Sequence, residues 1–287
     1  MKFLFKLLLF VMCGVAFADT RVILPFGPGG GVEITYRQLE KYLTQDKDMK
    51  IVTWYKPGAS GVVGLQELSK SPKDGSVLSY TTIASLSEAL KTSDLKFEYV
   101  TATNKLPMVL ITNNKTGIKN YKDFVKQSKS SKSYSFGYTS PAQLYGINQI
   151  INKVQPKKEM VVAPYKAGSN VITDLIGGQI DFAYLPYQSI KEYTGTKKII
   201  ILGSSLHIKD YPNILQFNKS YKDWVDISGY AVVLPKDTPK EYVDYWQKIL
   251  YDYMNDTRTK EQLKEEDSVA YPPGESFLKQ MVFQINK

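Results

Sequence analysis

The sequence contains very little cysteine and histidine, with one residue of each in 287. Cys13 lies in an apolar segment at the N-terminus that we expect to be removed. Its removal excludes disulfides, thiol nucleophiles and cysteine-based zinc sites from the remaining chain. His207 has no second histidine with which to share a metal ion or a catalytic triad, so a surface-loop position is favoured. We therefore expect no metal and no cofactor.

The sequence also has no apolar run long enough to cross a membrane. The run from Leu7 to Ala18 has 12 residues, whereas a spanning helix needs about 20. Lys2 and Lys6 precede it, and Ala16, Phe17 and Ala18 end it with small residues at alternate positions. This pattern is typical of a Sec-type signal peptide. It predicts cleavage after Ala18, a mature chain that starts at Asp19 and a periplasmic location.

The remaining composition is that of a globular protein, with 43% hydrophobic and 23% charged residues. At about 100 to 200 residues per domain, it predicts one large or two medium domains. The formal net charge is +9, which permits small anions or anionic surfaces as partners. No basic run or basic-aromatic stripe is present, so nucleic acid is not an expected partner.

Short apolar strands alternate with helical patterns along most of the chain, which predicts an α/β fold with parallel sheets covered on both faces. In the first half we expect strands at 21–26, 50–56 and 76–82, and helices at 32–44, 62–71 and 85–91. A second unit after 107–113 has expected helices at 121–129, 141–154 and 170–179, and strands at 134–139, 160–165, 180–186 and 198–204. A last strand at 229–235 precedes expected helices at 239–255, 260–266 and 275–286.

Polar or small-residue stretches at 113–117 and 224–229 separate these units. Two crossings imply a discontinuous domain, because the chain leaves the first unit and later returns to it. We therefore predict a signal peptide at 1–18, domain I at 19–112 and 229–287, and domain II at 113–228. The two connections are expected to form a hinge beside an interdomain cleft.

The most specific local feature is the glycine-rich stretch from Pro25 to Glu33, which follows the first strand and opens the first helix. Glycines allow close backbone approach, and a helix N-terminus offers unpaired N–H groups to an anion. The stretch therefore suggests a carboxylate or phosphate site, with a plain glycine-rich turn as the alternative. It lacks both G-x-G-x-x-G and the Gly-Lys-Ser/Thr of a P-loop, which excludes the nucleotide interpretations.

Other strands end in similar polar or glycine-containing segments. Ligands of open α/β sheets bind at the carboxyl ends of the strands, so we expect these ends to face one cleft. The candidate positions are Gly58, Ala59, Ser60 and Gly61 after the second strand, Thr81 and Thr82 after the third, and Thr139, Ser140, Lys166, Gly168, Ser169 and Pro186 in domain II.

Four motifs in this order resemble the substrate-binding receptors of tripartite tricarboxylate transporters, the Bug-type periplasmic proteins. They are Pro25–Gly30 with Glu33, Lys56–Gly61, Pro164–Gly168 and Thr173–Asp181. The resemblance covers the whole mature chain. It implies a two-lobed periplasmic-binding-protein (Venus flytrap, type II) architecture with two hinge-crossing strands. It also implies no catalysis, a small carboxylate ligand and a membrane permease as partner, and we expect a monomer.

The resemblance also implies roles for individual residues. Phe26, Gly29, Gly30 and Gly31 match the first carboxylate-binding loop, and Gly58, Ala59, Ser60 and Gly61 match the second. Ser140 lies in a matching helix-start segment, and Gly168 and Ser169 match the loop at the distal end of the ligand. Two departures are Gln143, where relatives often have His, and the absence of an Asp from 182–186. The missing Asp favours a di- or tricarboxylate over an amino acid.

Two other functions remain open from the sequence. The same fold serves in ligand-sensing receptors that act on a signalling protein. An exported enzyme acting on a carboxylate would need a base near the glycine loops, and only Glu33 is available there. A carboxylate at this helix position more often complements the helix dipole. Lys56 and Lys166 flank the loops and are candidates for steering anions, with solvated surface charge as the alternative.

Overall fold

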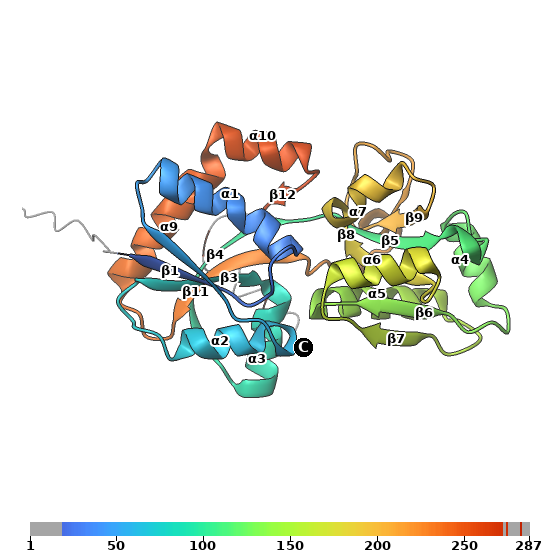
Figure 1. Cartoon of the computed structure of the whole chain (residues 1–287), viewed down its shortest axis with the longest axis horizontal. Helices are drawn as coiled ribbons and strands as arrows, with labels where there is room; N and C mark the ends of the chain where they lie inside the picture. The colour runs from blue at the N-terminus through green and yellow to red at the C-terminus, as the bar shows by residue number, and fades with distance from the viewer. Residues whose placement is uncertain (1–18, 272–273, 275–281, 283–287) are drawn as a thin grey trace, which may run out of the picture.

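The described chain forms two α/β lobes, each built on a six-stranded sheet with helices on both faces (Figure 1). The structure is a computed structural model that describes residues 19–271, 274 and 282. The expected signal peptide and almost all of the expected helix at 275–286 lie outside these residues. Within the described ranges, no helix is long and apolar enough to cross a membrane. The predicted two-lobed architecture is confirmed.

Lobe I contains the sheet with strand order β12-β4-β11-β3-β1-β2. Its strands are β1 (Thr20–Leu24), β2 (Ile51–Tyr55), β3 (Val77–Thr82), β4 (Phe97–Lys105), β11 (Gly229–Pro235) and β12 (Val269–Ala270). Its helices are α1 (Gly31–Gln45), α2 (Val62–Ser69), α3 (Ile83–Ser93), α9 (Lys240–Asn255) and α10 (Thr257–Glu265), and a 3-10 turn, η1 (Ala59–Gly61), precedes α2.

Lobe II contains the sheet with strand order β10-β9-β5-β8-β6-β7. Its strands are β5 (Met108–Asn113), β6 (Ser135–Tyr138), β7 (Val161–Pro164), β8 (Phe182–Pro186), β9 (Ile199–Ser204) and β10 (Leu215–Gln216). Its helices are α4 (Tyr121–Ser128), α5 (Pro141–Val154), α6 (Gly168–Gly177), α7 (Tyr187–Thr194) and α8 (Phe217–Ser220), and η2 (Asn114–Thr116) follows β5.

Side chains that cap the first turn explain where several helices begin. The side chains of Thr82, Asn120, Ser140 and Asp256 each accept a hydrogen bond from a backbone N–H of the helix that follows. Such caps satisfy N–H groups that have no partner within the helix. Pro141, directly after Ser140, has no N–H to leave unpaired and therefore suits the first position of α5.

The sheets are mixed rather than parallel as predicted, because each contains one strand that enters from the other lobe. β5 follows the first crossing and runs antiparallel to β8 and β9. β11 follows the second crossing and runs antiparallel to β3 and β4. The pairing of β5 also moves the first crossing to Leu106–Pro107, earlier than the predicted boundary between 112 and 113.

The two crossing segments are hydrogen-bonded to each other. The N–H of Leu106 donates to the carbonyl of Ser228 over 3.2 Å, and the Ser228 hydroxyl donates to the carbonyl of Leu106 over 3.0 Å. The side chain of Asp226 accepts bonds from both the N–H and the hydroxyl of Ser228. These hydrogen bonds pair the two crossing segments, so the lobes are joined by two connections that lie side by side.

Both inserted strands are buried along their whole length, which agrees with their continuous apolar sequences. In lobe II, β5 contributes Met108 and Leu110 to the core on one face and Val109 and Ile111 to the core on the other. The inserted strands therefore anchor the hinge in the buried interior of the two sheets.

Helix α5 packs closely on the sheet of lobe II at Gly146. A Cβ atom at this position would lie 2.2 Å from Cε1 of the buried Tyr184. Because the ring sits in a packed core, Gly146→Ala is expected to lower the free energy of unfolding by about 1 to 3 kcal/mol, despite the better helix propensity of alanine. Thermal or urea unfolding measures the change.

Gly177 in α6 provides the matched control, since a Cβ atom there would meet only Cγ of Gln179 at 3.9 Å. Gly177→Ala is expected to be neutral or stabilising. A Gly146→Ala protein as stable as the control would contradict the packing described for α5.

Candidate functional site

A cavity of about 320 Å³ lies between the lobes. Lobe I contributes Phe26, Gly27, Pro28, Gly29, Gly30, Gly31, Val32 and Thr82 to its lining, and the two crossings with the strands that follow them contribute Leu106, Met108, Ile227, Ser228, Gly229 and Tyr230. Lobe II contributes Thr139, Ser140, Ala142, Gln143, Lys166, Ala167, Gly168, Ser169 and Pro186. This volume suits a small ligand.

The strand register explains why these residues meet. Tyr230, near the start of β11, is paired with Thr82, at the end of β3. Met108, at the start of β5, is paired with Pro186, at the end of β8. Because the inserted strands are antiparallel, their beginnings lie beside the carboxyl ends of their neighbours, and all four residues line the cavity.

Five helices begin at the cavity. Their N-cap residues, Gly30 for α1, Thr82 for α3, Ser140 for α5, Ala167 for α6 and Pro186 for α7, all belong to its lining. Each N-terminus carries unpaired N–H groups and about half a positive charge. Among the described lining residues, Lys166 is charged and none is acidic. The site is therefore electrostatically suited to an anion.

The first turn of α1 offers backbone donors without the help of a basic side chain. The first bond within the helix runs from the N–H of Ile34 to the carbonyl of Gly30 over 3.1 Å. The N–H groups of Gly31 and Val32 come before this bond and so have no partner within α1. Gly29 has a φ of 82°, which favours glycine in the turn that leads into the helix.

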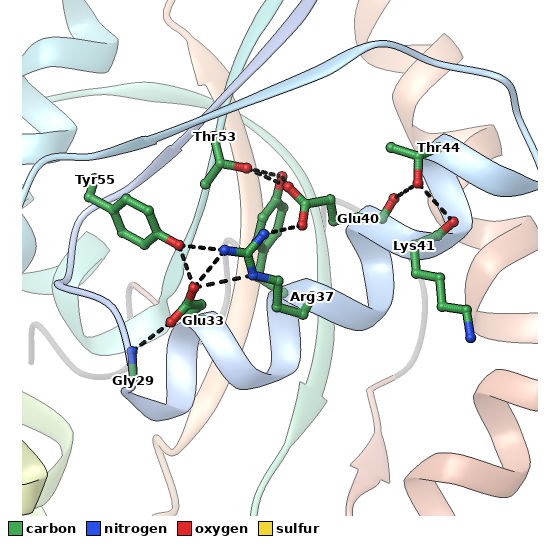
Figure 2. A network of polar contacts seen from close by, with 9 residues as sticks. Gly29, Glu33, Arg37, Glu40, Lys41, Thr44, Thr53 and Tyr55 are labelled. Carbon is green, nitrogen blue, oxygen red and sulfur yellow. Dashed lines mark hydrogen bonds and ion pairs between the residues drawn. The ribbon is translucent and has the colours of Figure 1, made fainter.

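Glu33 is hydrogen-bonded to this loop (Figure 2) and is absent from the cavity lining. Its Oε2 accepts the N–H of Gly29 over 2.5 Å. Its Oε1 accepts bonds from the hydroxyl of Tyr55 and from Arg37, whose Nη2 lies 2.8 Å away. The Tyr55 hydroxyl, the Gly29 N–H and Arg37 together hold the pKa of the Glu33 carboxyl below its usual 4.5.

The interactions of Glu33 decide between the two roles considered from the sequence. Both oxygens are engaged, the side chain is 14% exposed, and its lowered pKa makes it a weak base. Its first-turn position also complements the dipole of α1. Glu33 therefore shapes the glycine loop, and the lining provides no other carboxylate for general-base chemistry among its described residues.

The α5 end of the cavity is held by reciprocal capping. The hydroxyl of Ser140 accepts the N–H of Gln143, while Oε1 of Gln143 accepts the N–H of Thr139 over 2.6 Å. The Thr139 hydroxyl donates to the same oxygen over 3.1 Å. Gln143 therefore orients the two hydroxyl residues and is itself buried. The spacing is that of a capping box, but Gln143 accepts the N–H of Thr139 in place of that of the cap residue Ser140.

Tyr230 lines the cavity and was not predicted as a site residue. It is buried and stacks on Tyr80 with ring centroids 5.5 Å apart. Burial raises the pKa of its phenol, so the hydroxyl stays protonated. A Cβ atom at Gly31 would lie 2.9 Å from this oxygen, which explains the glycine at the start of α1.

Most of the site residues predicted from the sequence lie around the cavity. They are Phe26, Gly29, Gly30, Gly31, Thr82, Thr139, Ser140, Lys166, Gly168, Ser169 and Pro186. Half of the lining residues that were missed come from the crossings and the strands that follow them, such as Leu106, Met108 and Ile227. Leu106 and Met108 precede the boundary predicted between 112 and 113.

The second glycine loop does not line the cavity. Gly58, Ala59, Ser60 and Gly61 follow β2, which is the edge strand of its sheet. The loop packs behind Phe26, since a Cβ atom at Gly61 would lie 3.3 Å from the Phe26 ring. Thr81 is also absent from the lining because it is fully buried within β3.

The single histidine lies outside the cavity lining. His207 is exposed, and its Nδ1 is 3.4 Å from Nε2 of Gln216. No group of three or more His, Cys, Asp or Glu side chains suited to a metal ion occurs within the described ranges.

Comparison with known proteins identifies relatives of the chain. The family model described as tripartite tricarboxylate transporter family receptor matches residues 35–284. The chain is similar to Protein BugT of Bordetella pertussis, with 24% identity over 241 residues that cover 78% of this chain and 72% of BugT.

Solved structures show the same fold. The alignment with the periplasmic binding protein BugD has a TM-score of 0.80 at 19% identity. It covers 93% of this chain and 94% of the BugD chain. A Rhodopseudomonas palustris protein solved with adipate has a TM-score of 0.83 at 14% identity, with 93% of each chain covered.

The hydrogen bonds of Glu33 lead to a prediction about stability and pH. Glu33→Gln removes one acceptor oxygen and the charge, so it is expected to lower the free energy of unfolding at pH 7 by about 1 to 3 kcal/mol. The folded pKa lies below 4.5. The contribution of the carboxylate is therefore complete above this pH and is lost as the pH falls through the folded pKa.

Urea unfolding of both proteins between pH 7 and pH 3 tests this, with the exposed Glu261→Gln as control. The difference between wild type and Glu33→Gln should shrink in acid, while Glu261→Gln should match wild type throughout. A Glu33→Gln difference that is absent at pH 7, or constant with pH, would contradict the role of the carboxylate.

Proposed function

Because the chain belongs to the receptor family of tripartite tricarboxylate transporters, we propose that it is a periplasmic solute receptor for a small di- or tricarboxylate. The ligand binds between the lobes and is delivered to a membrane permease of this transporter type. The observation that carries the proposal is the convergence of five helix N-termini on a cavity whose described lining contains no acidic residue.

Backbone donors explain how the site binds a carboxylate without an arginine. The N–H groups of Gly31 and Val32 accommodate one carboxylate at α1, and the hydroxyls of Thr139 and Ser140 lie on the facing wall. Fixed dipoles need little reorganisation when an anion binds, and burial strengthens their effect. Lys166, which is exposed at the start of α6, adds charge at the lobe II side.

Apolar side chains form another part of the lining. Val32, Leu106, Met108 and Ile227 suit the carbon chain of an organic acid better than an inorganic anion. The adipate bound to one structural neighbour is an acid of this kind. A lining with both polar and apolar groups therefore favours an organic carboxylate.

The mechanism we propose is closure about the hinge. Residues from both lobes line the cavity, so a ligand contacts each lobe and stabilises the closed arrangement. The chain crosses between the lobes at the paired segments around Leu106 and Ser228, and both residues line the cavity. The permease then recognises the closed form.

The periplasmic location rests on the signal-peptide pattern at 1–18 and on the similarity to periplasmic BugD. We propose no catalytic step, since the single candidate base, Glu33, is occupied in shaping the loop. In cells, loss of the gene should abolish uptake of the ligand. Uptake that persists while induction by the ligand is lost would favour the ligand-sensing alternative.

A thermal-shift screen of residues 19–287 tests carboxylate binding. The panel contains dicarboxylates, tricarboxylates, amino acids and aromatic acids, with sulfate, phosphate and neutral diesters as controls. A ligand at about 100 times its Kd should add about 2.7 kcal/mol of stability and shift the Tm by a few degrees. Stabilisation by sulfate or phosphate alone would overturn the carboxylate proposal.

Lys166→Gln tests the charge at the lobe II side. Because this lysine is exposed, its loss should weaken the affinity for the most stabilising carboxylate of the screen by only about two- to fivefold. The effect should decrease with added salt. Lys248→Gln, exposed on α9 in lobe I, is the control, and titration calorimetry measures both. Equal affinities for the two variants would exclude Lys166 from the site.

A further inference from the structure

The positive charge of the molecule is concentrated on one lobe. Residues 107–228, which form lobe II, contain 16 Lys, no Arg and 8 Asp or Glu. Residues 19–106 and 229–287 contain 19 Lys or Arg and 20 Asp or Glu. Lobe II therefore carries a net charge of +8 and the rest of the mature chain −1. Ligand binding in the cavity does not account for this asymmetry, since Lys166 is the one lysine among the described lining residues.

Exposed lysines gather along α4 and on a loop beside it. We call this surface the lysine face, and it consists of Lys119, Lys122, Lys126, Lys129, Lys157 and Lys158. Lys122 and Lys126 lie on the side of α4 opposite the buried Phe124 and Ser128. Lys119 precedes the helix, and Lys129 is its C-cap residue. The N–H of Lys157 donates to the carbonyl of Ser128 over 2.9 Å, so the loop lies against the end of α4.

The lysine face has little compensating negative charge. None of its lysines forms an ion pair with a described residue. The side chain of Asp123, the acidic residue on α4, instead accepts the backbone N–H of Lys119 and the amide of Asn120. Like charges four residues apart, such as Lys122 and Lys126, repel each other and destabilise the helix. An external anion would relieve this repulsion.

The chemistry of the lysine face identifies the kind of partner. Specific protein interfaces are enriched in arginine and aromatic residues and depleted in lysine. Here arginine is absent from the whole lobe, and the nearby rings of Phe124 and Tyr134 are buried. Lysine is a flexible, strongly hydrated point charge that suits a diffuse anionic surface. Clusters of four to eight such residues bind anionic phospholipids.

We propose that the lysine face attaches the receptor to the surface of a bilayer that contains anionic phospholipid. α4 lies at the end of lobe II that is farthest from lobe I, so attachment there leaves the interlobe cavity open (Figure 1). A receptor held in this way searches for its transporter along the membrane instead of through the whole compartment. The proposal goes beyond carboxylate binding and does not depend on the identity of the ligand.

Co-sedimentation with vesicles tests the proposal. Residues 19–287, which contain every described helix and strand, are mixed with vesicles of equal parts phosphatidylglycerol and phosphatidylcholine, or of phosphatidylcholine alone. The protein should bind the anionic vesicles at low salt. This binding should weaken as added salt shortens the screening length, and the protein should not bind the neutral vesicles. A triple variant should reduce the partition coefficient for the anionic vesicles on the order of a hundredfold. It combines Lys122→Gln, Lys126→Gln and Lys157→Gln.

A matched triple variant of lobe I removes the same charge from elsewhere. It combines Lys70→Gln, Lys248→Gln and Lys264→Gln, all of them exposed, and it should bind anionic vesicles almost as wild type does. Both variants should keep the wild-type Tm and the thermal shift with carboxylate, so a failure of membrane binding is distinct from a failure of the receptor proposal.

Two outcomes would overturn the lipid proposal. One is equal loss of vesicle binding in the two triple variants, which would show that net charge matters and the lysine face does not. The other is no binding of wild type to anionic vesicles. In that case, retention on vesicles that contain the transporter, lost in the lysine-face variant, would assign the face to an acidic protein partner instead.

Discussion

The unpaired N–H groups at the helix N-termini are the feature on which the site depends. α1 and α3 follow strands of lobe I, and α5, α6 and α7 follow strands of lobe II, so all five begin at the carboxyl ends of β1, β3, β6, β7 and β8. Some of these donors have acceptors, since Thr82 and Ser140 cap α3 and α5 and the carbonyl of Pro107 accepts the N–H of Tyr187. The remaining N–H groups and the dipoles of the five helices favour an anion or ordered water in the cavity. The binding preference therefore follows from the topology, and the side chains chiefly adjust it.

The same topology explains why the hinge lies beside the cavity. β5 and β11 must enter their sheets antiparallel, because each arrives from the other lobe at the edge where the parallel strands end. Their first residues, Met108 and Gly229, then line the cavity, while the rest of each strand is buried in a sheet centre. The connection between the lobes thus lies next to the cavity and is anchored in the buried sheets.

Much of this arrangement could be predicted from the sequence, because apolar strands and glycine-rich helix starts are local signals. The span of α5 agrees with its prediction, since Ser140 and Pro141 mark its start. β4 was missed because its second half, Thr101–Lys105, is mostly polar although it is largely buried, and no glycine-rich loop follows it. The prediction of parallel sheets was wrong because the direction of β5 and β11 depends on pairing between distant segments. No local sequence pattern encodes this pairing.

The site was predictable to the extent that strand ends identify it. The second glycine loop has the same composition as the first, yet β2 lies at the sheet edge and its loop supports Phe26 instead of lining the cavity. Sequence composition does not distinguish these cases, because strand order is a property of the whole sheet. Tyr230 was missed for a similar reason, since its register with Thr82 brings it to the cavity.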